Sequence, residues 1–167
     1  MSGWFFMLGE ALSPGELSQL RDYVRALGIE GEVAIEQVSS FSSARAVITN
    51  PEWDRRYWEA EQAEKQRLSA AASALRGSRE LVQLQSRSIE LSREAVHGAA
   101  AVAAARFGCS DVGLIGAAAG AASEMLHLAE LAELAGERPP HPFLSKKAVF
   151  EAGHWPLGAL GARYYVF

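Results

Sequence analysis

The sequence predicts a helix-dominated α+β fold, with a small antiparallel sheet and a long α-helical hairpin inserted before the last strand. A capped helix follows the N-terminal aromatic run, two alanine-rich segments meet at Gly108, and residues 164–167 end the chain as an aromatic strand candidate. With the hairpin removed, the expected order is β-α-β-β-α-β, which is typical of a split-βαβ sandwich. An irregular helical bundle with a small sheet attached is the alternative fold.

The first 77 residues are expected to alternate between strands and helices. Residues 4–8 are short, aromatic and followed by a glycine, which indicates a buried strand that pairs with the C-terminal strand. Ser13 is the expected N-cap of the next helix, with Pro14 at its first position and Glu16 completing a capping box. The other elements expected here are a strand at 32–36, a turn at 39–43, a strand at 46–48, and a helix from Asn50-Pro51 to Gly77.

Two long helices are expected to form the hairpin over residues 78–136, with a left-handed glycine, Gly108, at its turn. Ser110 or Asp111 is the expected cap of the second helix. The small residues of "GAAAG" at 116–120 indicate a close crossing of two helices. The Gly- and Pro-containing tail rules out a further long helix, and its last residues are expected to form the final strand.

We expect one domain spanning 1–167, with a sheet-containing part at 1–77 and 140–167 and the hairpin at 78–136. The net charge of -4 predicts no cationic face, so nucleic-acid binding is not expected. The single cysteine, Cys109, suits a reducing compartment. The N-terminal apolar run lacks a basic leader, and the longest uncharged run is mostly alanine and glycine. We therefore expect a cytoplasmic protein that does not associate with membranes.

Two Glu-x-x-His steps, Glu94 with His97 and Glu124 with His127, have the spacing found in di-metal carboxylate bundles. In such a site, iron, manganese or zinc would bind carboxylate and imidazole groups that project inward from the helices. Here both imidazoles lie away from the apolar stripes of their helices. The two steps are also offset by about 12 Å along an antiparallel hairpin. We expect no cofactor, and metal binding stays as an alternative.

The clearest features of the sequence concern packing: a long alanine- and glycine-rich hairpin, aromatic terminal segments and helical faces of mixed charge. These features favour a non-enzymatic protein-interaction module such as an accessory subunit, an adaptor or an inhibitor-type binder. The hairpin would associate with another copy of the chain or with a protein partner. Its expected interface residues are Leu81, Leu84, Leu91, Leu114, Met125 and Leu128. No catalytic residue is assigned. A second alternative is a small-ligand-binding protein with an aromatic pocket formed by Trp4, Trp53, Tyr57 and Trp155.

Overall fold

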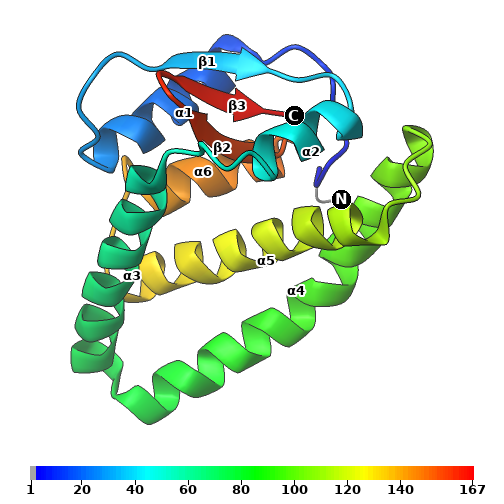
Figure 1. The fold of residues 1–167 in the computed structure, drawn as a ribbon. Helices are drawn as coiled ribbons and strands as arrows, with labels where there is room; N and C mark the ends of the chain where they lie inside the picture. The colour runs from blue at the N-terminus through cyan, green and yellow to red at the C-terminus, as the bar shows by residue number, and fades with distance from the viewer. Residues whose placement is uncertain (1–2) are drawn as a thin grey trace.

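The computed structural model describes residues 3–167 apart from the side chain of Leu91, and it has the predicted helix-dominated α+β fold (Figure 1). Its elements are α1 (Pro14–Ala26), β1 (Ala34–Gln37), α2 (Phe41–Ile48), α3 (Arg55–Arg76), α4 (Ser78–Arg106), α5 (Val112–Leu134), α6 (Pro142–Glu151), β2 (Pro156–Leu160) and β3 (Arg163–Val166). The predicted hairpin is present as α4 and α5. The predicted N-terminal helix is α1, and Ser13 and Glu16 form its capping box.

The sheet is mixed, and in this respect the prediction of an antiparallel sheet is wrong. The strand order is β1-β3-β2, with the C-terminal strand β3 in the centre. Strand β3 runs parallel to β1, with Ile35 opposite Tyr164, and antiparallel to β2, with Leu160 opposite Arg163. The order of a split-βαβ sandwich is therefore not formed, because one of its expected strands is a turn and another is a helix.

The aromatic run at 4–8, predicted to be a strand paired with the C-terminus, forms a tight turn. Phe5 has a φ of 59°, in the left-handed region that an extended strand does not visit. Its side chain is buried and meets Phe150 edge to face. The Met7 amide donates to the Gly153 carbonyl at 3.1 Å, and a Cβ at Gly153 would lie only 2.7 Å from the Met7 nitrogen. A short run of aromatic residues is compatible with a buried turn as well as with a buried strand, so the sequence pattern alone does not distinguish the two.

Helix α2 replaces the turn and strand predicted between residues 39 and 48. The Ser40 side chain caps it by accepting a hydrogen bond from the Ser43 amide at 3.1 Å. The residues that α2 buries follow a helical spacing and are Phe41, Ala44 and Val47. The next helix, α3, is capped by Asp54 and therefore begins later than the predicted start at Asn50.

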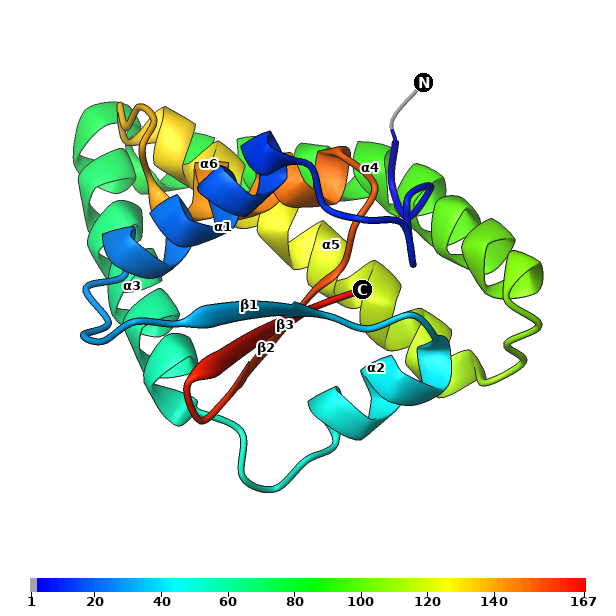
Figure 2. The same cartoon turned by 90° about the horizontal axis from the view of Figure 1, so that it is seen from above.

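Helix α6 lies where the sequence predicts a break followed by an irregular tail. The His141 imidazole is its N-cap and accepts a hydrogen bond from the Phe143 amide at Nδ1, at 3.2 Å. Pro142 occupies the first helical position, where a missing amide hydrogen costs nothing. Helix α6 packs against α1 and α5, and Figure 2 shows α1 and α6 side by side.

The hairpin turns at Gly108, as predicted, and Asp111 caps α5 by accepting a hydrogen bond from the Leu114 amide at 3.0 Å. Helices α3, α4 and α5 are arranged as three sides of a triangle, in which α4 converges on α5 toward the turn (Figure 1). In the segment 116–120, where a close helix crossing was predicted, the buried residues are Ala118 and Ala119 and not the glycines. Gly116 and Gly120 are exposed, and a Cβ on either would meet nothing within 4 Å.

Helix α5 is the central core helix. Its buried residues are Leu114, Ala118, Ala119, Ala122, Met125, Leu128, Ala129, Leu131 and Ala132. Among the helices of residues 3–167, α5 alone is long and apolar enough to cross a membrane by length and composition. A core helix of a globular protein meets the same criteria, and the packing of α5 against α3, α4 and α6 matches that description. A second cluster of buried residues joins α1 to the sheet through Tyr23 and Tyr164.

Candidate functional site

Helix α4 carries an apolar series at seven-residue spacing, which places Val82, Ile89, Val96 and Ala103 on one face. Val96 and Ala103 are buried against the rest of the chain, with exposed fractions of 1% and 5%. Val82 and Ile89 are exposed by 60% and 44%. The difference follows the path of α5, which lies close to α4 near the turn and diverges from it toward the start of α4 (Figure 1). We call Val82 and Ile89 the open face of α4.

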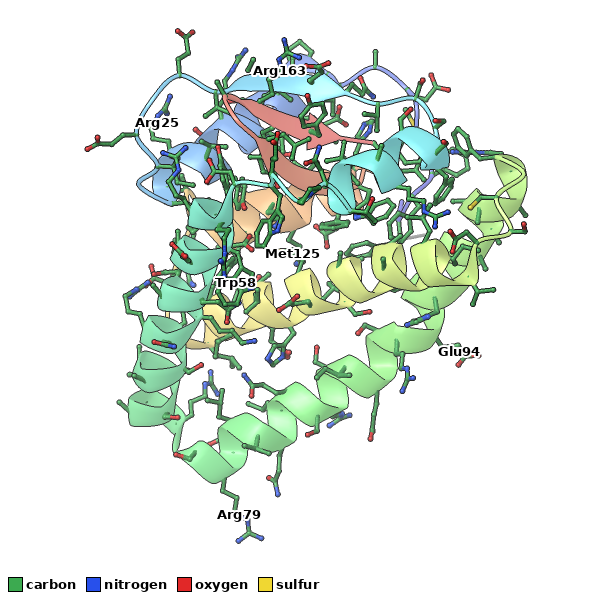
Figure 3. All side chains as sticks on the ribbon, viewed as in Figure 1. Arg25, Trp58, Arg79, Glu94, Met125 and Arg163 are labelled. Atoms are coloured by element: carbon green, nitrogen blue, oxygen red, sulfur yellow. The ribbon has the colours of Figure 1, made fainter. Side chains whose placement is uncertain are left out.

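The surroundings of the open face are electrically balanced. The first eighteen residues of α4, 78–95, contain the arginines Arg79, Arg87 and Arg93 and the glutamates Glu80, Glu90 and Glu94. Figure 3 shows Arg79 and Glu94 pointing away from the body of the protein. Leu75, at the end of α3 beside this region, is 67% exposed. The start of α4 therefore combines exposed apolar side chains with charges of both signs and no net charge.

A polar seam lies where α5 diverges from α4. Ser123 Oγ, His127 Nδ1 and Glu130 Oε2 are spaced along α5 at helical intervals, and each is buried without a hydrogen-bond partner among the described residues. Ser88 and Ser92 of α4 line a shallow pocket together with Glu130. Burial lowers the pKa of His127, and the nearby Lys65 ammonium lowers it further. Polar atoms therefore lie between the two helices at this level.

The two Glu-x-x-His steps do not meet. Glu94 and His97 are exposed on α4, and Figure 3 shows Glu94 directed outward. Glu124 is exposed on α5, with an oxygen 3.9 Å from Lys65 Nζ, and His127 lies in the seam. Within residues 3–167, no three His, Cys, Asp or Glu side chains come together in a group that could hold a metal ion.

Four of the six predicted interface residues belong to the core of this chain. Leu81, Leu114, Met125 and Leu128 have exposed fractions of 5%, 5%, 3% and 2%. Leu84 is half-buried, and the side chain of Leu91 lies outside the described residues. The sequence did not reveal that α6 and α3 would cover these faces. The exposed apolar residues Val82 and Ile89 lie near them in α4. The seven-residue spacing from Val82 to Ala103 identifies this apolar face but not which part of it is exposed.

The predicted aromatic pocket is not formed as one cavity. Trp155 is buried and lines a cavity beside α5. Trp4 packs against Phe150 with ring centroids 6.2 Å apart, and Tyr57 packs against Tyr164 at 5.4 Å. Trp53 is 41% exposed. Trp4 and Trp155 thus belong to one core cluster and Tyr57 to another, and the four residues do not line a common cavity.

A buried charged cluster, which the sequence did not suggest, joins α1, α3 and α6. Lys146 Nζ donates to Glu61 Oε1 at 2.7 Å, and the Tyr23 hydroxyl donates to the same oxygen at 2.9 Å. The side chains of Lys146 and Glu61 are each only 15% exposed. Burial opposes the charged ammonium, but the Glu61 carboxylate outweighs it and holds the pKa of Lys146 above its usual value. Burial also raises the pKa of Tyr23, so its hydroxyl remains a donor.

A second polar network braces α3 against the chain that follows the hairpin. His141 Nδ1 accepts from the backbone, so Nε2 carries the ring proton and donates to Glu64 Oε1 at 2.9 Å. Arg67 donates to Glu64 and to Glu137, both at 2.6 Å. Hydrogen bonds from Arg67, and then from His141, hold the pKa of Glu64 below its usual value. These contacts position α6 and have the character of structural links.

Comparison with known proteins adds no relative. No family model, no curated protein and no solved structure matches this chain.

Proposed function

We propose that this chain is a protein-interaction module that associates with a second copy of itself through the open face of α4. The observation that carries the proposal is the single apolar series of α4, which is buried at Val96 and Ala103 but exposed at Val82 and Ile89. A partner helix laid along the first half of α4 would continue the cover that α5 gives to the second half. Burying apolar area in this way stabilises association by about 25 cal/mol per Å².

The charge pattern is compatible with a second copy of the chain as the partner. A two-fold interface brings the same surface of two protomers together, so a strongly charged surface would repel itself. Residues 78–95 contain equal numbers of arginines and glutamates, and self-association therefore meets no net repulsion. The exposed Leu75 would extend the apolar contact at the junction of α3 and α4.

The test is the native mass of the purified chain, measured by light scattering after gel filtration over a range of concentrations. We expect a dimer or a larger assembly for the wild type and a monomer for Ile89→Glu, because a charge placed in the interface would lose its water without gaining a partner. The matched control is Val102→Glu. Val102 is on the same helix and 72% exposed, but it lies roughly 140° around the helix from Ile89.

Circular dichroism melts of both variants should show that each is folded, since neither position is buried in the chain. A wild type that stays monomeric at every concentration would contradict self-association. Equal loss of mass in the Ile89→Glu and Val102→Glu variants would show that the open face is not the interface.

A further inference from the structure

Strand β1 forms one edge of the sheet. The strand order β1-β3-β2 leaves one side of β1 without a neighbouring strand among the described residues, and Figure 1 shows this side at the outer margin of the sheet. The Ala34 amide donates to the Ala162 carbonyl at 3.0 Å, and the Val38 amide donates to the Val166 carbonyl at 2.8 Å. Because successive residues of a strand direct their backbone groups to opposite sides, the N–H and C=O groups of Ile35 point away from β3. No other described segment forms a backbone hydrogen bond with Ile35.

The N-terminal segment meets this edge only at its far end. Gln37 Nε2 donates to the Glu10 carbonyl, and the Leu12 amide donates to Gln37 Oε1 at 3.3 Å. The stretch without a neighbour therefore lies at Ile35 and before it. We call this stretch the open edge of β1.

A groove of about 700 Å³ runs beside the open edge, between β1 and α1. Figure 2 shows α1 and β1 lying side by side, joined at one end by the loop 27–33. The apolar lining residues are buried or half-buried and are Val24, Ile29, Val33 and Ile35. Unpaired backbone groups beside an apolar groove suit an extended chain, because its backbone can bond to the edge while its alternate side chains enter the groove.

The α1 wall of the groove is cationic. Arg21 and Arg25 lie one helical turn apart, and both line the groove. Arg25 has an Asp22 oxygen at 3.4 Å, but the Arg25 side chain is 79% exposed, so this pair is weak. Arg21 has no carboxylate oxygen within 4.0 Å among the described residues. The other charged lining residues, Glu32 and Arg163, are one of each sign, and the α1 wall therefore favours a carboxylate on a bound segment.

We propose that the open edge of β1 binds an extended peptide segment of another protein as an added strand. The peptide backbone would bond to Ile35, and alternate apolar side chains would enter the groove over Val24 and Ile29. A carboxylate in the same row of side chains would lie beside Arg21. The peptide is a different partner from the second copy proposed for α4, and the inference does not depend on self-association.

The test titrates three synthetic peptides, blocked at both ends, into the full chain by isothermal calorimetry. The peptide ETVTVTE presents its valines and glutamates on one side in either strand direction, and KTVTVTK reverses its charge. The third peptide is ETVTVTE with N-methyl groups on its three central residues. We expect ETVTVTE to bind and the other two to bind about tenfold more weakly, because one loses charge complementarity and the other lacks backbone donors. No binding of ETVTVTE at millimolar concentration, or equal binding of either control peptide, would overturn the proposal.

Hydrogen exchange followed by NMR locates the bound peptide on the edge. Exchange of the Ile35 amide should slow about tenfold when the chain is saturated with ETVTVTE, because this amide faces the open edge. The Ala34 amide is the internal control, since it is already bonded to the Ala162 carbonyl. Unchanged exchange at Ile35 in the saturated chain would overturn strand addition.

A charge exchange tests the role of Arg21. Arg21→Glu should weaken binding of ETVTVTE and strengthen binding of KTVTVTK, each by about fivefold, and the exposed position should leave the fold intact. The matched control is Arg138→Glu, which makes the same change of charge at an exposed position outside the groove and should alter neither affinity. Equal effects of the two variants would count against the site. A fall in native mass on adding ETVTVTE would show that a second copy occupies the edge, and would also overturn the proposal.

Discussion

The two halves of α4 carry the same apolar spacing but lie in different surroundings. In the second half, Val96, Ala100 and Ala103 are buried against the core. In the first half Leu81 is buried, Ser88 and Ser92 line the shallow pocket beside Glu130, and Val82 and Ile89 are exposed. The side chains that bring α4 and α5 together are mostly alanines, and small residues let two helices approach closely. An apolar repeat thus indicates that one face of a helix is buried. How far along the helix the burial extends depends on the side chains of the neighbouring helix.

The largest expected effect comes from introducing a charged side chain into each half of α4. Val96→Asp should lower the free energy of unfolding by about 3 kcal/mol or more, because the buried carboxylate would have no partner. Val82→Asp should change it by less than about 0.5 kcal/mol at dilutions where the chain is monomeric. Urea unfolding followed by circular dichroism measures both values. Similar losses in the two variants would show that the halves do not differ in burial.

Replacing glycines within the hairpin should change the free energy of unfolding by a smaller amount, and in the stabilising direction. Gly98 lies in α4 and Gly120 in α5, and a Cβ at either position would meet nothing within 4 Å. Gly98→Ala and Gly120→Ala should each raise the free energy of unfolding by about 0.5 to 1 kcal/mol, because alanine loses less backbone freedom in a helix.

Thermal melts check this gain, with Gly153→Ala as the contrasting variant. Gly153 has a φ of 104° and lies against the backbone of the N-terminal turn, so this substitution should destabilise the protein. A loss of stability in Gly98→Ala would mean that α4 is more closely covered at that level than the structure shows.

The smallest expected effect concerns pH at the polar seam, where His127 is half-buried. Burial and Lys65 lower the pKa of His127 in the folded state, against the opposing influence of Glu130 and Glu124. The unfolded chain then binds a proton more readily than the folded one, so stability should fall as pH drops below about 6.5 toward the folded pKa. His154, also with a pKa lowered by burial, contributes with the same sign.

His127→Gln should reduce the loss of stability between neutral pH and mildly acidic pH without abolishing it, since His154 remains. Melting temperatures of both proteins across this range provide the measurement. An identical pH profile in the variant and the wild type would show that His127 gains its proton equally well in the folded chain.

The parts of the fold that the sequence predicted correctly have local signals of their own. The capping box of Ser13 and Glu16, the turn at Gly108 and the cap at Asp111 each depend on side chains within a few residues. The segments predicted wrongly depend on distant contacts. The N-terminal turn is held by Gly153, which is far away in the chain. The sheet is mixed because β3 pairs antiparallel with the adjacent β2 and parallel with the distant β1, and the parallel pairing has no local signal.

The candidate sites were less predictable for a related reason. The open face of α4 differs from the buried half only in what lies opposite, and the sequence of α4 does not contain that information. The pair of Glu61 and Lys146 joins α3 to α6, and the two residues are 85 positions apart in sequence. The sequence does not predict the helix that supplies Lys146, because its proline-rich segment indicates a break, whereas Pro142 occupies the first position of α6.

Three side-chain links, Glu61 with Lys146, Glu64 with His141 and Arg67 with Glu137, fasten α3 to the returning chain at the root of the hairpin. The other end of the hairpin is fastened as well, because Arg106 donates to the Phe6 carbonyl at 2.6 Å and Phe107 packs against Phe167 with ring centroids 5.2 Å apart. Both ends of the hairpin are therefore tied to the rest of the chain, and its length cannot be changed without displacing one set of these contacts.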